Sequence, residues 1–463
     1  MSFRRRRSCL RFCPAPRGCH ADGATPEPAA AGSDLSEKID DAQGWGQGVC
    51  AIVALPATTT ENLTVLIPLG EPTLPSKRPA QGFALFALGF RPFYLLAAAL
   101  AVVIVPLWLA AFAGWLVLPT ALPPVAWHAH EMLFGFGCAV ITGFLFTAGR
   151  NWTGIDTPTG GALAALALLW LGGRVAMLAG PGGLGAVVDL AFLPLVAIAL
   201  GRVLVKAGSR RNYFVLLLLA ALAGANGLFH LRAAAVVDGD PMQGVRLALA
   251  LIITLTTVIG GRVIPMFTVN GLRGSVAIAT HTPHDFAAIA FTVAALLAWA
   301  LGLPAVVAAP LATAASLAQI NRVVRWLPWA TRRVPLLWIL HLSHAWIPAG
   351  LALLALAEAG VVAASAAIHG LALGAMSGLI LGMITRTALG HTGRLLQAGP
   401  IETAAYVALH LAVLARVLPM LLAPEYTLLG LVVAALGWCT AFALYLIRYG
   451  PMLVRTRVDG KPG

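Results

Sequence analysis

The chain has 463 residues, of which 59% are hydrophobic and 11% are charged, and its mean hydropathy is +0.86. Soluble domains average about 45–50% apolar and about 25% charged residues, so this composition excludes a soluble globular protein and indicates a polytopic integral membrane protein. The formal net charge of +13 does not indicate nucleic-acid binding. After Pro92 the basic residues lie mainly in short connections between apolar runs, where they mark membrane topology.

Residues 1–80 differ in composition from the rest of the chain. Four arginines, Arg4 to Arg7, precede a stretch rich in Pro, Ala, Gly and Asp without helical periodicity. This composition predicts a disordered basic extension. No apolar core follows the arginines closely enough for a signal peptide, so we expect the extension to stay cytoplasmic. We expect a transmembrane domain over residues 81–450 and a cytoplasmic C-terminal tail over residues 451–463.

The transmembrane domain is predicted to be an all-α bundle of about twelve spans. A span needs about 20 apolar residues to cross about 30 Å of hydrocarbon. The predicted spans are 83–113, 127–149, 161–179, 184–205, 212–235, 244–267, 284–302, 305–326, 335–357, 361–385, 402–423 and 426–448. The Lys and Arg residues lie in every second connection between these spans, and so all on one side of the membrane. This places both termini in the cytoplasm and requires an even number of spans.

Three spans end on related sequences, which favours a threefold pseudosymmetric bundle. The ends of spans 2, 6 and 10 are ITGFLFTAGRNWTG, IGGRVIPMFTVNG and LILGMITRTALGHTG. A repeat every four spans predicts that these three spans take equivalent places.

Four arginines lie within the outer halves of apolar spans: Arg174, Arg232, Arg246 and Arg416. A charged group at the bilayer centre costs about 2.5 kcal/mol or more, so each needs a partner. One interpretation pairs them with outer acids or lets them reach the surface, the acids being Glu131, Asp189, Asp238, Asp240 and Glu425. The other interpretation has some of them bind carboxylates of a cofactor, such as haem propionates.

Seven of the eleven histidines lie inside spans or at their ends: His128, His130, His230, His341, His344, His369 and His410. At about 1.5 Å per residue, the first three lie within about 8 Å of the outer face and His369 about 12 Å below it. The remaining three lie about 9–14 Å from the inner face, so we predict an outer and a more buried cluster. Neutral imidazole binds haem iron and copper. Hydrogen-bonded core histidines, or a path for protons or a solute, are the alternatives.

Spacing separates the pairs within these clusters. His341 and His344 are three residues apart and share a helix face, so both can reach one site. His128 and His130 are two apart and diverge by about 200° if the helix has begun, so that one binds and the other caps or contacts water. Pro123 and Pro124 leave room for a non-helical start.

Five segments resemble a known family. They are GFRPF from Gly89, WHAHEMLFGF from Trp127, GFLFTAGRNWTG from Gly143, GGRVIPMFTVNG from Gly260 and MITRTALGHTGR from Met383. With them, the chain from about Gly82 to Tyr449 is similar to the NnrS family of bacterial membrane proteins. The resemblance implies a twelve-span protein of the bacterial inner membrane that binds haem and copper and is associated with tolerance of nitric oxide, a possible ligand. It names neither a molecular activity nor an electron donor.

The expected sites combine this resemblance with the positions above. By fold-level analogy with the haem–copper oxidases, whose spans 2 and 10 carry haem ligands, His128 or His130 would hold a haem with His369. Spans 6 and 7 have no mid-membrane histidine, which argues against a proton-pumping oxidase. We expect cofactor binding at His128, His130, His230 and His369, with Arg174, Arg232, Arg246 and Arg416 near the propionates. We expect a second, metal-binding site at His341, His344 and His410, with Glu131 as a further metal ligand.

Two other functions are open. A transporter of a small solute or metal would use the same intramembrane histidines and arginines, with Gly- and Pro-interrupted spans lining its path. A scaffold or regulator would carry no chemistry. Visible absorbance of the purified protein would favour the cofactor interpretation, whereas solute flux through a colourless protein would favour the transporter.

Overall fold

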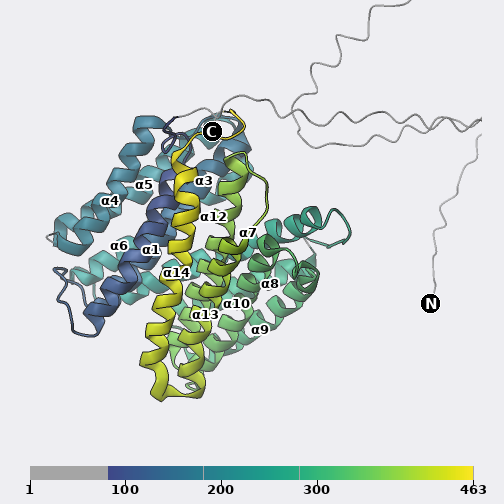
Figure 1. Cartoon of the computed structure of the whole chain (residues 1–463). Coiled ribbons are helices and arrows are strands. Elements are labelled where there is room, and N and C mark those ends of the chain that lie inside the picture. Colours follow the sequence, from purple (N-terminus) through teal and green to yellow (C-terminus); the bar gives the residue numbers. More distant parts are fainter. Residues whose placement is uncertain (1–81, 181, 281, 462–463) are drawn as a thin grey trace, which may run out of the picture. The chain divides into compact units, whose positions relative to one another are not determined.

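The structure is a computed structural model that describes residues 82–180, 182–280 and 282–461 (Figure 1). The predicted N-terminal extension, residues 1–80, lies outside these residues. The described part of the chain is helical and contains no β-strand beyond one isolated bridge between Phe83 and Arg455. The predicted all-α membrane bundle is therefore confirmed.

Each of the twelve predicted spans overlaps a helix or a series of helices. In chain order the elements are α1 (Phe90–Phe112), α2 (Pro124–His130), η2 (Glu131–Gly137), α3 (Cys138–Thr153), α4 (Gly160–Ala179), α5 (Gly182–Lys206), η3 (Arg210–Asn212), α6 (Phe214–Ala233), α7 (Met242–Gly271), α8 (Pro283–Ala300), α9 (Ala305–Val324), η4 (Pro328–Thr331), α10 (Pro335–Glu358), α11 (Ala364–His369), η5 (Gly370–Ser377), α12 (Gly378–His391), α13 (Pro400–Leu422), η6 (Pro424–Tyr426) and α14 (Thr427–Val454). The last helix therefore continues into the predicted C-terminal tail.

Eleven helical spans in the described residues are long and apolar enough to cross a membrane, and α9 is the predicted span that is not among them. This helix has 20 residues but carries Gln319, Asn321 and Arg322 in its last turns. The backbone at the two ends of the bundle decides whether it crosses. The amide of Ala84 donates a hydrogen bond of 2.7 Å to the carbonyl of Val454, so α1 starts and α14 ends on the same side. An even number of crossings is required, and α9 supplies the twelfth.

Arg91 of the GFRPF segment fastens these two ends together. Its side chain is fully buried, and Nη1 donates to three carbonyl groups at the end of α14, those of Met452, Leu453 and Arg455, at 3.3, 2.9 and 2.7 Å. The last carbonyls of a helix have no intrahelical partner, so a buried guanidinium satisfies them. The segment thus joins the first span to the last.

Spans 2 and 10 share an interruption that their sequences did not predict. Each changes from α-helix to a wider π-helix, over seven residues in η2 and eight in η5, and each change directly follows a histidine, His130 or His369. π-Helical segments rotate the side chains that follow them and are frequent at functional sites. In η5 a close helix contact accompanies the change, because a Cβ on Gly374 would lie 2.5 Å from the ring of Trp346.

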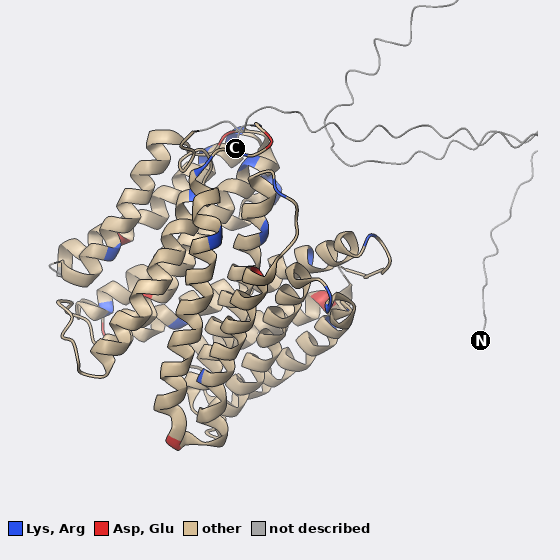
Figure 2. Ribbon diagram, viewed as in Figure 1, with Lys and Arg blue, Asp and Glu red and all other residues tan. Residues whose placement is uncertain are grey.

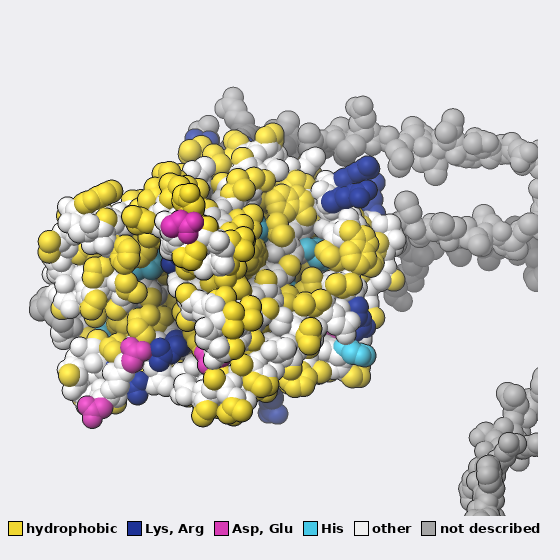
Figure 3. All heavy atoms as spheres, turned by 90° about the horizontal axis from the view of Figure 1, so that it is seen from below, with side chains coloured by type: hydrophobic (Ala, Val, Ile, Leu, Met, Phe, Trp, Pro, Cys, Tyr) yellow, Lys and Arg dark blue, Asp and Glu magenta, His cyan; other side chains and the backbone are white. Residues whose placement is uncertain are grey.

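Spans 2 and 10 also form much of the interior, with 83% and 72% of their most apolar windows buried, and α7 contacts both η2 and η5. The three spans with related ends therefore pack near one another, while the threefold pseudosymmetry stays a prediction. Charged residues are sparse along the ribbons (Figure 2), and hydrophobic side chains dominate the face of Figure 3. Exposed side chains such as Leu217 and Leu436 suit contact with lipid.

Candidate functional site

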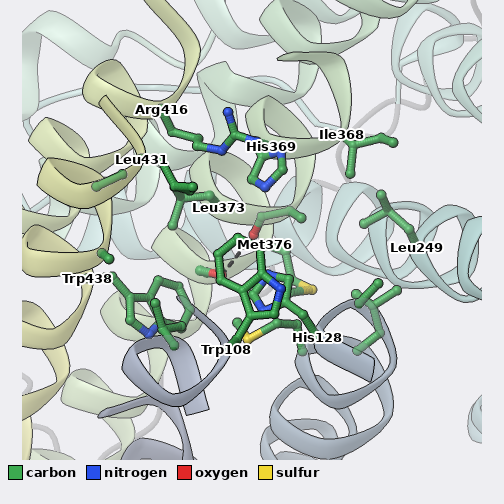
Figure 4. Close-up of a pocket in the computed structure, with 18 of the residues that line it drawn as sticks. Trp108, His128, Leu249, Ile368, His369, Leu373, Met376, Arg416, Leu431 and Trp438 are labelled. Carbon is green, nitrogen blue, oxygen red and sulfur yellow. Dashed lines mark hydrogen bonds between the residues drawn. The ribbon is translucent and has the colours of Figure 1, made fainter. Parts of the chain in front are cut away.

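A largely apolar pocket lies between spans 1, 2, 6, 10, 11 and 12, in the half of the bundle away from the start of α1 and the end of α14; Figure 4 shows its lining. Its cavity volume is about 120 Å³, and it opens toward the surface. Its lining includes two histidines from different spans, His128 of α2 and His369 of α11.

His128 is held by ring stacking rather than by hydrogen bonds. Its ring lies parallel to that of Trp108, with centroids 4.1 Å apart and 23° between the planes. Its Nδ1 is buried and has no hydrogen-bond partner among the described residues. A buried nitrogen without a partner costs about 1–3 kcal/mol, so a ligand that used it would remove that cost.

His369 has one nitrogen anchored and the other free. Nδ1 lies 2.7 Å from the carbonyl oxygen of Ser365, which can only accept, so Nδ1 carries the proton and Nε2 keeps its lone pair. The ring points into the pocket from the side opposite His128 and Trp108 (Figure 4). An imidazole fixed in this way by a backbone carbonyl is the usual arrangement of a metal-ligating histidine.

The two histidines lie at nearly the same depth. Helix α11 begins at Ala364, three residues later than the predicted span, so His369 lies about 7.5 Å from the helix start at about 1.5 Å per residue. His128 lies four residues after Pro124, or about 6 Å from its own start. The predicted depth difference between the two is not found, because span 10 begins three residues later and span 2 three residues earlier than predicted.

Arg416 is the one intramembrane arginine of the predicted four that lines this pocket. Its Nη2 donates to Ser365 Oγ at 3.0 Å and its Nη1 lies 3.0 Å from the sulfur of Met420. Within the described ranges it forms no ion pair. A buried cation without an anion beside a cavity favours an anionic group on whatever fills that cavity.

The other three arginines have protein partners away from the pocket. Arg174 pairs with Glu131 and Asp189, Arg246 pairs with Asp240 at 2.9 Å, and Arg232 donates to Gln243 and to the carbonyl of Asp240. Pairing with outer acids is thus found for Arg174 and Arg246. Arg232 is satisfied by an amide and a carbonyl oxygen instead.

His130 lies in a second, polar site formed by spans 2 to 5. Its Nδ1 is 3.0 Å from Glu131 Oε1, and its Nε2 is 2.9 Å from Asn226 Oδ1 and 3.3 Å from Asp189 Oδ2. The same Asp189 oxygen accepts from His230 Nε2 at 3.0 Å and from Asn226 Nδ2 at 2.7 Å. We call this set, with Arg174, the ionic cluster.

Three groups of the ionic cluster converge as metal ligands do. One ligand atom each from His130, Asp189 and His230 lie within 4.8 Å of one another, the one such group of three among the described residues. Asp189 entered the sequence analysis only as a partner for arginine. The signal that could have identified it as a ligand is that it is the only acid in the apolar helix α5.

The predicted outer site of four histidines is therefore two sites. His128 and His369 line the apolar pocket, while His130 and His230 belong to the ionic cluster. The reason is that residues two apart on an α-helix point about 200° away from each other.

The three inner histidines do not converge into such a ligand group in the described part of the chain. His341 Nε2 bonds Thr268 Oγ1 at 2.8 Å, and His410 Nδ1 donates to the carbonyl of Tyr406 at 2.9 Å. His344 is fully buried beside Trp326, and neither of its ring nitrogens has a hydrogen-bond partner within residues 82–180, 182–280 and 282–461. The predicted second metal site at these residues stays a prediction that this geometry does not support.

Comparison with known proteins identifies the family. No curated protein matches the chain. The family model described as NnrS protein matches residues 84–457, which includes every span and both candidate sites. The chain therefore belongs to the NnrS family.

Proposed function

We propose that this protein is a haem- and copper-binding protein of the bacterial inner membrane that protects the cell against nitric oxide, by turning it over or by limiting its damage to iron. The observation that carries the proposal is the pair His128 and His369, which face one apolar pocket from spans 2 and 10. Positive connections on one side, together with the hydrogen bond between Ala84 before α1 and Val454 at the end of α14, support cytoplasmic termini.

The residues of the pocket fit a haem. Two imidazoles offer nitrogen ligands, and Met132 and Met376 add thioether sulfurs to the lining. Arg416 supplies a cation for a propionate, and the remaining walls are mainly aliphatic and aromatic. When bound, haem iron supplies a centre at which nitric oxide can bind.

The chain's own residues perform the positioning. The carbonyl of Ser365 fixes the tautomer and direction of the His369 ring, and Trp108 holds the ring of His128 by stacking. The apolar walls exclude water from the ligating nitrogens, which strengthens their interaction with a charged centre. A π-helical turn begins directly after His369 in span 10 and two residues beyond Ala129 in span 2, close to both histidines.

The ionic cluster fits copper better than the inner histidines do. Imidazole nitrogens suit copper, and His130 and His230 supply two of them beside the carboxylate of Asp189. Glu131 accepts from His130 Nδ1, so a metal would take the place of the proton on Nε2, which faces Asn226 Oδ1 and Asp189 Oδ2. Without metal, a doubly protonated His130 and Arg174 would balance Glu131 and Asp189, so a purely structural ion-pair network is the competing interpretation.

Absorbance spectra of the purified protein test the haem. We expect a Soret band that shifts when nitric oxide is added to the reduced protein, and its loss in His369→Ala, while the matched variant His341→Ala keeps it. A haem spectrum that survives both His128→Ala and His369→Ala would overturn the site. A colourless protein after expression with ample haem would contradict the haem-binding function and favour a transporter instead.

Metal analysis tests the copper site separately. We expect about one copper per chain, retained in His344→Gln and lost in His230→Gln, with haem content equal in both. His230 suits this test because it stands at the edge of the cluster with a single hydrogen bond. Copper retained in His230→Gln and Asp189→Asn would leave the cluster as an ion-pair network only.

A further inference from the structure

A second pocket, unlike the first, is basic and lies on the surface where α14 ends. Three arginines line it, Arg394, Arg448 and Arg455, together with apolar side chains that include Ile401, Ile447 and Met452. It stands between α13, α14 and the connection that follows α12. This is the opposite end of the bundle from the pocket of His128 and His369, so neither candidate cofactor site explains it.

The charges of the basic pocket are not balanced. Glu402 accepts from Arg448 Nε at 3.1 Å and from the Tyr449 hydroxyl at 2.9 Å, which neutralises one guanidinium. Arg394 and Arg455 have no ion pair with any acid in the described residues. Burial and then the positive charges of Arg448 and Arg455 lower the pKa of Arg394. Two positive charges therefore remain for an external anion.

The pocket is held in shape by the chain that follows α14. The carbonyl of Arg455 accepts from Arg91 at 2.7 Å, and Arg457 Nη1 donates to the carbonyl of His391 at 2.9 Å. The amide of Val458 donates to the carbonyl of Thr392 at 3.2 Å. These bonds fasten the tail against the connection that carries Arg394. Arginines on a fixed frame lose less freedom on binding, which favours a specific site over a diffuse charge.

The flank of the basic pocket is apolar and faces outward. Ile447 is 69% exposed on the transmembrane helix α14, and Leu395 is 82% exposed beside Arg394. Exposed aliphatic side chains at the end of a membrane span suit contact with acyl chains. Basic pockets between transmembrane helices at the membrane surface are sites for anionic lipid head groups. A soluble phosphate would use the arginines but leave this flank in water.

We propose that the basic pocket binds one anionic phospholipid, with its phosphate among Arg394, Arg448 and Arg455 and its acyl chains against Ile401 and Ile447. The proposal does not depend on haem or copper. It predicts selectivity for phosphatidylglycerol or cardiolipin over phosphatidylethanolamine, since only the anionic lipids supply the charge that the cluster lacks.

Native mass spectrometry tests this in nanodiscs of equal phosphatidylglycerol and phosphatidylethanolamine. We expect the wild-type protein to retain one phosphatidylglycerol, and the double variant R394Q/R455Q to retain it about tenfold less, a change equivalent to about 1.4 kcal/mol. The matched control is R332Q/R333Q, which removes the same charge from an exposed turn outside any described pocket. It should retain the lipid as the wild type does.

Three results would overturn the proposal. Equal lipid retention in the wild type and R394Q/R455Q would show that the basic pocket does not bind the lipid. Equal loss of lipid in both double variants would show that only general surface charge matters. Displacement of the lipid by millimolar inorganic phosphate identifies a soluble-anion site. Circular dichroism and gel filtration check folding, and the single variant R394Q replaces the double variant if the latter does not fold.

Discussion

His128 and His130 are two residues apart on one short helix, yet their surroundings are opposite. His128 stacks on Trp108 beside an apolar pocket and keeps a buried nitrogen without a partner. Both nitrogens of His130 face oxygen atoms of Glu131 and Asn226. The first arrangement leaves a ring nitrogen available to a ligand. In the second arrangement both ring nitrogens contact protein oxygen atoms, so a metal could bind only by replacing a proton.

The two sites also differ in what holds them together. The ionic cluster takes Arg174, Glu131 and Asp189 out of water, which costs several kcal/mol per ion and is offset only while all the partners are present. The pocket is lined mainly by apolar side chains, so the exchange of one polar group there leaves no partner charge buried and unpaired. Variants at the two sites should therefore have different effects.

The largest expected effect is in the ionic cluster. Asp189→Asn removes the carboxylate that Arg174, His130 and His230 share, and leaves a buried guanidinium only partly paired. We expect a loss of about 3–5 kcal/mol in stability, measured as the unfolding midpoint in detergent. The control Asp240→Asn removes an exposed partner of Arg246 and should cost less than about 1 kcal/mol. Equal effects would mean that the cluster contributes no more than a surface pair.

A smaller effect is expected from Arg416→Gln in the pocket. Arg416 has no ion pair in the described structure, so its loss should leave the fold intact while haem dissociates about 10- to 100-fold faster, as for one charge-assisted hydrogen bond of about 1.5–3 kcal/mol. Transfer of haem to apomyoglobin measures the rate. The matched variant Arg232→Gln lies away from the pocket and should release haem at the wild-type rate. Equal rates of haem release in the two variants would show that Arg416 takes no part in haem binding.

The third expected effect is a gain in stability. Among the described residues, both ring nitrogens of the fully buried His344 are without a hydrogen-bond partner, as Nδ1 of His128 is, but His344 lines neither candidate site. Replacing a buried unsatisfied polar group with leucine removes a cost of about 1–3 kcal/mol. We expect His344→Leu to raise the unfolding midpoint without changing the haem spectrum. A variant that is less stable, or that loses metal, would indicate that His344 binds a partner.

The smallest effect concerns an ion pair at the surface. Arg457 binds both carboxylate oxygens of Asp459 and lowers its pKa to about 2. The pair therefore stabilises the tail at neutral pH, and that contribution fades as pH falls from about 4 through about 2. Asp459→Asn should cost less than about 1 kcal/mol, seen as faster hydrogen exchange confined to the tail at pH 7. Exchange that is faster throughout the bundle would contradict this.

Much of the fold could be predicted because hydropathy is a local property. Every predicted span overlaps a helix, and the segments that resemble the NnrS family lie within the match to that family. The pairing of Arg174 with Glu131 and Asp189 could be anticipated because a charge in a membrane needs a nearby opposite charge. The π-helical turns after His130 and His369 could not, since no composition distinguishes them from an α-helix.

The sequence by itself determined the class of protein, the positions of its spans and the residues with capacity for chemistry. Only the tertiary structure decided which of those residues share a site: His369 lines one pocket with His128, His230 lies with His130, and His341, His344 and His410 form no group of three ligands among the described residues. The physical reason is that burial of an apolar helix depends on its own residues, whereas a site depends on the rotation and depth of several helices together. Those are set by packing across the whole bundle, to which residues far apart in the chain contribute.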